Sequence, residues 1–474
     1  MKRYLHYFAD GGRRLTTGTD CVEVIDPSTE APSGSVRLCS SADLHAALSS
    51  ARACAESWAA TSVPQRQAAL QRLRTALSER QESLVHAMAI DIGCPVWLSQ
   101  TVHVPMALKG LDNAIEFVAK VQWSEVVGNA VVERVPFGIV AAITPWNAPL
   151  HQMVAKVAAA MAAGCTTVLK PSELAPACAD LFINALEAAQ LPPGVVNVVW
   201  GDARIAGEML ADPRIDKVSF TGSTRTGKLL LARCAERVLP ATVELGGKSA
   251  AVLLDDANLD AALPMVMRSC MANSGQTCVA QSRLIVPAHH LREIEARLVD
   301  LAQAWPPGNP MNEATRLGPV ASQAQFIHVQ KQVSTALEQG ARLACGGADR
   351  ALPLGYFLAP TVLTEVDAAM QVANTEVFGP VLSVLAAKSD DDAIRLANAT
   401  PYGLSGAVWS SDPDRAARAA RRLRTGQVVL NGAAQNLATP FGGWGESGIG
   451  RENGRFGIEA FLQYRALHGL VDSS

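Results

Sequence analysis

Residues 138–147 read GIVAAITPWN, a short apolar run that ends in a polar, proline-containing turn. Similar runs follow within residues 138–254, separated by Ala-rich segments with helical spacing; they are CTTVLK, VVNVV, KVSF and AVLLD. A second region, roughly residues 246–442, carries RLIVP, TVLTEV and VLSVLA. Short apolar strands alternating with helices are typical of βαβ units. The sequence therefore predicts an α/β protein with two α/β layers and a ligand crevice between them.

The flanking segments predict other elements. Residues 41–88 are rich in Ala, Leu, Arg and Gln at helical spacing and predict two or three amphipathic helices. Residues 121–135 are typical of a two-stranded ribbon that turns at Gly128-Asn129, and the tail segment FLQYRALHGL predicts one more strand. A ribbon has little core of its own, so we expect it to pack on another surface, such as a second subunit.

Composition excludes several classes of function. The 474 residues are enough for about three compact units. Lys and Arg number 41 and Asp and Glu 44, and this balance argues against nucleic-acid binding. No apolar run reaches membrane-spanning length and the N-terminus lacks the apolar core of a secretory signal, so we expect no membrane partner. The ten cysteines show no CxxC pairing; we expect reduced thiols in a cytoplasmic protein and no metal site.

One cysteine has an unusual setting. Cys278 ends a polar, Gly-containing turn over residues 273–278, after a predicted helix over residues 259–272. Cys270 and Cys165 lie instead within apolar runs, as structural cysteines do. Because most cysteines are inert, Cys278 taken alone fits both a nucleophile and a small buried side chain.

Two further polar residues stand at the ends of predicted strands. Glu244 precedes Gly246 and Gly247, which allow a ligand to approach closely; it fits a general base, and equally an ion pair with Lys248 or a helix cap. Asn147 lies in a loop fixed by two prolines. Its amide fits a donor to a developing oxyanion, and equally a side chain that satisfies its own turn.

Two segments suit phosphate and ribose groups. GSTRTGKL follows the strand KVSF, so Gly222 and Ser223 offer backbone N–H groups and a helix N-terminus to a phosphate. The segment departs from a nucleotide-hydrolase P-loop at Leu229, where a hydroxyl is needed to hold Mg²⁺. Lys170 and Glu173 close another strand and suit ribose hydroxyls. An ordinary capped helix and a solvated ion pair are the alternatives.

The order and intervals of these motifs resemble those of the NAD(P)-dependent aldehyde dehydrogenase superfamily, over nearly the whole chain. The matching segments are PWN (145–147), KPSE (170–173), FTGS (220–223), ELGGK (244–248), GQTC (275–278), EVFGP (376–380), PFGG (440–443) and SGIGRE (447–452). The resemblance favours the functional alternative for Cys278, Glu244 and Asn147.

The resemblance implies a domain plan. A Rossmann-like cofactor domain is expected over residues 1–118 and 137–245, and an α/β catalytic domain over residues 246–442. The ribbon (119–136) and the tail (457–474) match the family's oligomerisation elements. A homodimer or homotetramer is therefore expected.

The resemblance also implies a mechanism. The Cys278 thiolate would attack the aldehyde carbon, and the Asn147 amide with the Cys278 backbone N–H would hold the oxyanion. Hydride transfer to the nicotinamide would leave a thioester, which water activated by Glu244 would hydrolyse. Two rivals are weaker. CoA-acylating relatives commonly lack a Glu at position 244, and a catalytically idle binding relative would usually have lost Cys278 or Glu244.

Cofactor contacts are carried over from the family residue by residue. The expected positions are Trp146, Lys170, Glu173, Gly222, Ser223, Glu376 and Phe378, of which Glu376 would hold the nicotinamide ribose. The Glu173 carboxylate would repel a 2′-phosphate, so NAD is expected, with NADP possible. The roles of Lys156 and Glu452 are left open, although some relatives carry a proton-relaying acid at the second position.

The substrate tunnel is expected to be wide. Relatives acting on small aldehydes often place aromatics where this chain has Ala148 and Ala155, and the loop over residues 433–439 carries no charge. We expect a bulky, uncharged aldehyde, aromatic or terpenoid-like. The alternatives are a semialdehyde or short aliphatic aldehyde, with side chains such as Met153 refilling the space.

Overall fold

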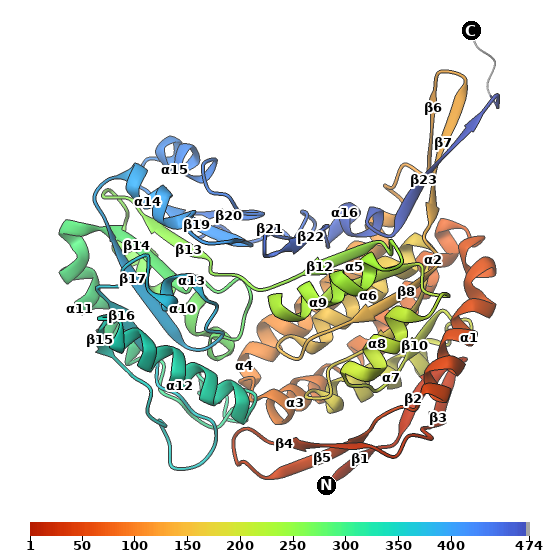
Figure 1. The fold of residues 1–474 in the computed structure, drawn as a ribbon, viewed down its shortest axis with the longest axis horizontal. Helices are drawn as coiled ribbons and strands as arrows, with labels where there is room; N and C mark the ends of the chain where they lie inside the picture. The colour runs from red at the N-terminus through yellow and green to blue at the C-terminus, as the bar shows by residue number, and fades with distance from the viewer. Residues whose placement is uncertain (471–474) are drawn as a thin grey trace.

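The structure, a computed structural model, describes residues 1–470 and contains two lobes, each built around one sheet (Figure 1). The first sheet has eight strands in the order β22-β12-β11-β8-β9-β10-β2-β3. Its five central strands are mutually parallel, and they are β8 (Ile139–Ile143), β9 (Thr166–Lys170), β10 (Val196–Val198), β11 (Lys217–Thr221) and β12 (Ala241–Glu244). Four of them coincide with predicted apolar runs, and β12 is the strand expected to end at Glu244, so the α/β prediction is confirmed for this lobe.

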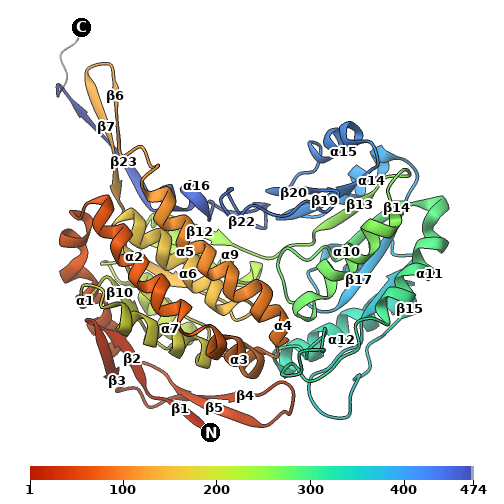
Figure 2. The same cartoon turned by 180° about the vertical axis from the view of Figure 1, so that it is seen from behind.

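Helices connect and cover these strands. The connections are α6 (Pro149–Ala163), α7 (Pro176–Ala189), α8 (Ala203–Ala211) and α9 (Thr224–Ala235). The predicted N-terminal helices are α1 (Ser41–Ala59), α2 (Val63–Ser78) and α3 (Gln81–Ile92). After α4 (Val96–Leu98), a π-helical turn, η1 (Ser99–His103), leads into α5 (Val104–Val118), which packs along α6 (Figure 2).

The pattern did not predict several strands near the N-terminus and at the sheet edge. β2 (His6–Ala9) and β3 (Gly12–Leu15) extend the first sheet antiparallel, and β22 (Gly448–Ile449) closes its other edge against β12. A separate small sheet contains β1 (Lys2–Tyr4), β5 (Pro32–Arg37) and β4 (Cys21–Ile25).

The second sheet has seven strands in the order β15-β16-β17-β14-β13-β19-β20. They are β13 (Ala250–Leu253), β14 (Arg283–Pro287), β15 (Arg342–Cys345), β16 (Thr361–Thr364), β17 (Val381–Ala387), β19 (Ser405–Trp409) and β20 (Gln427–Leu430). The run AVLLD, grouped by pattern with the first region, forms β13 and belongs here. Alternate β13 residues enter two different apolar clusters, as expected for a strand covered on both faces.

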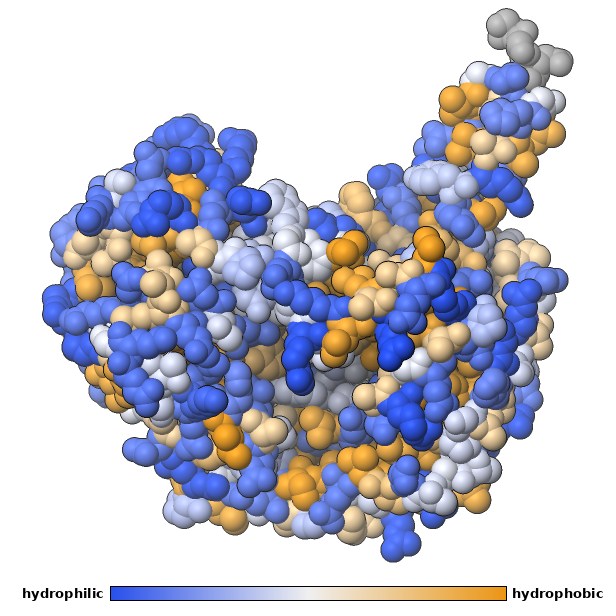
Figure 3. Space-filling view, viewed as in Figure 1, coloured by the Kyte–Doolittle hydropathy of each residue, from blue (hydrophilic) through white to orange (hydrophobic). Residues whose placement is uncertain are grey.

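Helices and short elements complete this lobe and its return to the first. The helices are α10 (Leu259–Met271), α11 (Leu291–Ala302), α12 (Gln323–Glu338), α13 (Gln371–Asn374), α14 (Asp390–Ala397), α15 (Pro413–Ala420) and α16 (Gly454–Glu459), with η2 (Ala272–Gly275) and η3 (Ala288–His290). β18 (Tyr402–Gly403) pairs with β21 (Trp444–Gly445). On the face drawn in Figure 3, the surface is hollowed between the two lobes.

An arm projects from the first lobe. β6 (Ser124–Val127) and β7 (Ala130–Pro136) form the predicted ribbon, and β23 (Leu462–His468) pairs with β7 as the third antiparallel strand (Figures 1 and 3). Val126, Val127 and Tyr464 are exposed on it. Residues 471–474 of the expected oligomerisation tail lie outside the described residues. Within residues 1–470, no helix is both long and apolar enough to cross a membrane.

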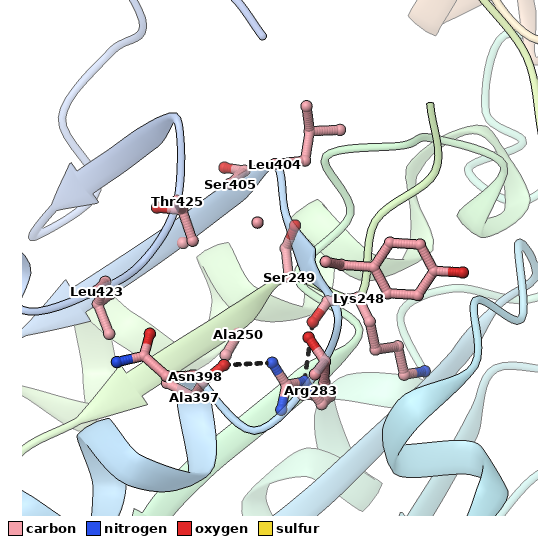
Figure 4. Close-up of a pocket in the computed structure, with 14 residues that line it drawn as sticks. Lys248, Ser249, Ala250, Arg283, Ala397, Asn398, Leu404, Ser405, Leu423 and Thr425 are labelled. Atoms are coloured by element: carbon pink, nitrogen blue, oxygen red, sulfur yellow. Dashed lines mark hydrogen bonds between the residues drawn. The ribbon is translucent and has the colours of Figure 1, made fainter. Parts of the chain in front are cut away.

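One buried arginine ties the second sheet to a covering helix. Arg283 begins β14 and donates hydrogen bonds to the backbone oxygens of Lys248, Leu396 and Ala397 at 2.7–2.8 Å. Figure 4 shows the guanidinium turned toward these oxygens at the wall of a polar pocket. The arginine thereby joins the start of β13 to the end of α14.

We predict that Arg283→Met destabilises the protein by roughly 3 kcal/mol, because three buried carbonyls lose their donor. The measurement is the thermal midpoint of unfolding, expected to fall by several degrees. The matched control is Arg395→Met on α14, the helix to which Arg283 is bonded. The Arg395 side chain is 65% exposed, so this change should leave the midpoint nearly unchanged. Equal effects of both changes would contradict the assigned role of Arg283.

Candidate active site

Cys278 is presented by a turn with an unusual backbone. Asn273, Ser274 and Gly275 have φ angles of +53°, +56° and +73°, the left-handed region that side chains disfavour. A Cβ on Gly275 would overlap the Gly379 carbonyl oxygen, so this position requires glycine. Cys278 is partly exposed, whereas Cys270 is buried, in line with the contrast drawn from the sequence.

Side-chain amides hold this turn against the loop after β8. Asn147 Nδ2 donates to the Gln276 carbonyl oxygen at 3.0 Å, and Asn273 Nδ2 donates to the Asn147 carbonyl oxygen at 2.9 Å. Gln276 Oε1 accepts from the Ala321 backbone N–H at 2.8 Å. Because Gln276 lies two residues before Cys278, the hydrogen bond from Asn147 to Gln276 places the Asn147 side chain close to Cys278. No role in holding the turn was expected from the sequence for Asn273 or Gln276. The only indication was that both are polar residues inside it.

Glu244 ends β12 with its side chain 2% exposed. Neither carboxylate oxygen has a hydrogen-bond partner within residues 1–470, and the ion pair with Lys248 considered from the sequence is not formed there. Burial and the nearby Glu452 raise the pKa of Glu244 well above its usual range. A buried, unpaired carboxyl with a raised pKa is suited to exchange a proton with water.

The two residues with open roles form a buried ion pair. Lys156 Nζ lies 2.6 Å from Glu452 Oε1 and donates to Thr221 Oγ1 at 2.7 Å. The chain separates Lys156 and Glu452 by 296 residues, so only the fold brings them together. Because Lys156 is paired here, it leaves the carboxyl of Glu244 without a direct partner.

A third carboxyl, that of the half-buried Glu376, also lies near Cys278. Glu376 Oε1 accepts from the Gly247 N–H at 3.0 Å, and a Cβ on Gly246 would overlap this carboxyl. Burial raises the pKa of Glu376 to about 7. Nearby, Phe378 with φ +55° meets Trp146 edge-on at 5.6 Å between ring centroids.

The remaining expected cofactor positions cluster at strand ends of the first sheet. Lys170 Nζ donates to the Gly201 carbonyl oxygen at 2.6 Å and lies 3.4 Å from Glu173 Oε2. Ser223 caps α9 by accepting from the Thr226 N–H, and a Cβ on Gly222 would overlap the Phe220 ring. A glycine turn before a capped helix N-terminus and a Lys–Glu pair suit the phosphate and ribose groups of a dinucleotide.

The surroundings of Cys278 disfavour its thiolate form. Burial raises its pKa to about 12, and the charges of Glu376 and Glu244 act in the same direction. Both carboxyls are therefore close enough to influence the sulfur, and they approach it from different elements. A thiol, an amide donor and two carboxyls thus gather at the junction of the two lobes.

This combination of fold and site defines an aldehyde-oxidising class of α/β enzymes. Residues 15–467 match the model of the aldehyde dehydrogenase family. The chain therefore belongs to the aldehyde dehydrogenase family, and the expected family, fold class and enzyme class are confirmed.

Two curated relatives match the chain over nearly its full length. 3-Succinoylsemialdehyde-pyridine dehydrogenase from Pseudomonas sp. is 40% identical over 477 residues, covering 100% of both chains. Geranial dehydrogenase from Castellaniella defragrans is 36% identical over 474 residues, covering 98% of each.

Solved structures show the same fold. An aldehyde dehydrogenase C mutant from Pseudomonas syringae, complexed with NAD+ and octanal, has a TM-score of 0.97 at 40% identity and covers 99% of this chain and 97% of its own. The Mycobacterium tuberculosis aldehyde dehydrogenase complexed with NAD+ has a TM-score of 0.96 at 36% identity, with 98% coverage of each chain.

We predict that iodoacetamide alkylates Cys278 of the protein alone slowly at neutral pH, at a rate that rises through pH 10, because its thiol pKa is about 12. Glu376→Gln should increase the rate at pH 9 several-fold, since it removes a nearby negative charge. Peptide mass spectrometry follows each site, with exposed Cys21 as the internal reference. A plateau of the Cys278 rate below pH 8 would contradict the prediction.

Proposed function

We propose that the protein oxidises a bulky, uncharged aldehyde to its carboxylic acid with NAD+, through a covalent intermediate on Cys278. The observation that carries this proposal is a buried, unpaired Glu244 carboxyl near a thiol that a strained turn presents beside the Asn147 amide. A free carboxyl at that place is suited to take a proton from water, so Glu244 also favours hydrolysis over transfer of the acyl group to CoA.

Cys278 is the nucleophile in this proposal. Its thiolate adds to the aldehyde carbon, and Asn147 Nδ2 with the Cys278 backbone N–H stabilises the resulting oxyanion. NAD+, when bound, supplies the acceptor for the hydride that leaves this carbon. Glu244 then takes a proton from water, the hydroxide adds to the thioester carbon, and the acid leaves with regeneration of the Cys278 thiolate.

The cofactor positions favour NAD. The Glu173 carboxylate beside Lys170 disfavours a 2′-phosphate, while Lys170 is already engaged by the Gly201 carbonyl oxygen. Both solved relatives described above hold NAD+. Glu376, fixed by the Gly247 N–H, is assigned to the hydroxyls of the nicotinamide ribose. Trp146, Phe378, Gly222 and Ser223 are assigned to the rest of the dinucleotide.

The substrate assignment rests on small side chains at the two predicted positions. Ala155 lines a recess between α5, α6 and α16, whereas Ala148 is buried and does not line that recess. Small residues such as Ala155 and Gly457 line most of it, and no charged side chain does. Met153, which was considered as a residue that refills the space, is fully buried and does not line it. The absence of a cation from the lining disfavours aldehydes with a carboxylate tail. The relatives named for geranial and for a pyridine semialdehyde support a bulky aldehyde.

The arm is the proposed oligomerisation surface. It extends from the first lobe and exposes Val126, Val127 and Tyr464, apolar side chains that a second subunit would cover in a homodimer or homotetramer. The domain limits proposed are residues 1–118 with 137–245, 246–442, and 119–136 with 457–474. A cytoplasmic location is proposed because all ten cysteines are free thiols.

We predict that Cys278→Ala abolishes aldehyde-dependent formation of reduced cofactor. Glu244→Gln should retain a burst of about one equivalent followed by slow turnover, because acylation precedes the step that needs the base.

We also predict that wild-type turnover rises from pH 6 to pH 9. Cys278 and Glu244 both act in their deprotonated forms, and burial raises the pKa of each. Stopped-flow absorbance measures both phases, with Glu116→Gln on the α5 surface as control. Undiminished turnover in Cys278→Ala would refute the mechanism, and lack of any wild-type activity would favour an idle binding protein.

We predict that kcat/KM is highest for bulky neutral aldehydes in a series from acetaldehyde through hexanal and geranial to aromatic aldehydes. The kcat/KM for succinic semialdehyde should be much lower.

We also predict that NAD is preferred over NADP. Glu173→Gln should reduce the ratio of the two kcat/KM values because it removes the charge that repels the 2′-phosphate. Steady-state kinetics with both cofactors test the two statements. Best activity on acetaldehyde would refute the substrate class.

A further inference from the structure

Residues 317–321, which we call the wedge, are buried at the place where the two lobes meet. Leu317 and Val320 pack into the two apolar clusters that cover the faces of the second sheet. Among the buried side chains of residues 246–442, only that of Ala321 packs into the apolar cluster of the first lobe. α12, which follows the wedge, reaches the first lobe beside α3 and α4 (Figures 1 and 2). A shift of one lobe against the other would therefore displace the wedge, because packed cores transmit strain.

The wedge contacts the first lobe at the end of α3, where the two backbones touch. Gly93 follows α3 in the left-handed region, with φ +69°. A Cβ on Gly318 would overlap the Gly93 carbonyl oxygen, and a Cβ on Gly93 would overlap the Pro319 ring, so both positions require glycine. On the side of the second lobe, the Val320 N–H donates to the Tyr356 carbonyl oxygen at 3.0 Å. The wedge is thus held from both lobes.

The same wedge supports the turn that presents Cys278. Ser274 Oγ donates to the Gly318 carbonyl oxygen at 2.8 Å, and the Ala321 N–H donates to Gln276 Oε1 at 2.8 Å. The side chains of Ser274 and Gln276 are buried, with 1% and 0% exposed. The residue Gly318 therefore contacts the first lobe and at the same time accepts a hydrogen bond from the turn.

The proposed reaction needs groups from both lobes at one place. Cys278 belongs to the second lobe and Asn147 to the first, and the oxyanion has to lie within hydrogen-bond distance of both the Asn147 amide and the Cys278 N–H. A displacement of about 1 Å between reacting groups can lower a rate by about 10²-fold. The contact that sets the position of the turn between the lobes is therefore expected to affect the rate.

We propose that the wedge is a positioning element of the reaction, whose contact with Gly93 sets where the Cys278 turn stands relative to the Asn147 amide. Ser274 and Gln276 are positioning residues, because they act through the backbone that carries Cys278. This inference rests on the proposed function and assigns to it residues outside the expected reacting and cofactor positions.

The test variant is Gly318→Ala, which adds one methyl group to the contact with Gly93. Gly318 lies outside the left-handed region, so the change adds steric overlap without backbone strain. In stopped-flow measurements, the rate constant for the burst of reduced cofactor should fall by about tenfold or more. The Kd for NAD and the KM for the aldehyde should change by less than about twofold, because the variant displaces the turn and leaves uniform binding intact. The control is Gly12→Ala on β3, where a Cβ has open space; it should leave all three quantities unchanged.

The outcomes separate this inference from the proposed function. A folded Gly318→Ala protein with the wild-type burst rate overturns the inference, and so does a slower burst matched by an equal weakening of NAD binding. If Gly318→Ala does not fold, Ser274→Ala removes one hydrogen bond to the wedge without adding an atom. It should slow the burst by about fivefold at unchanged Kd for NAD, and an unchanged burst overturns the inference. No burst from the wild type with any aldehyde overturns the proposed function, and the inference with it.

Discussion

The left-handed turn over Asn273, Ser274 and Gly275 is the constraint on which the site depends. Such backbone is costly for residues with side chains and persists only where surrounding contacts hold it. Here Ser274 Oγ donates to the Gly318 carbonyl oxygen at 2.8 Å, and the Asn273 amide reaches across to the loop after β8. The same contacts that compensate the strain fix Cys278 relative to Asn147, so the proposed nucleophile and the proposed amide donor are held together although they belong to different lobes.

Three carboxyls lie in this part of the molecule, two of them buried and that of Glu376 half-buried, and they have different hydrogen-bond partners. Glu452 is compensated by Lys156, Glu376 accepts one backbone hydrogen bond, and Glu244 is left without a partner. The raised pKa values of Glu376 and Glu244 follow from that order of compensation together with burial. The least compensated group is the one whose proposed role requires it to gain and lose a proton. The Lys156 charge beside Glu452 and the Gly247 N–H bonded to Glu376 limit the net negative charge near the Cys278 thiol.

Local pattern was enough for the parallel strands, the N-terminal helices and the ribbon, because period and turn chemistry act within a few residues. It failed where the partner was remote. β3 contains Arg13, which looks like surface sequence until its guanidinium meets Asp180 and Glu187 on α7. The pairing of Lys156 with Glu452 spans most of the chain, and the supporting role of Asn273 depends on the loop after β8. The motif resemblance predicts which residues react, which stays a prediction, and it carried no information on their protonation or on which side chains hold them.

Helix α6 shows how one element serves chemistry and specificity separately. Successive residues turn by about 100°, so His151, Ala155 and Ala158 share the face that lines the recess, while Lys156 points to Glu452 and Met153 into the core. Asn147 immediately precedes the helix and is held by the Cys278 turn. The residues on the recess face are therefore separate from those that form the ion pair and hold the amide. One helix therefore carries the lining of the recess and the lysine of the buried ion pair on different faces, directly after the loop that holds Asn147.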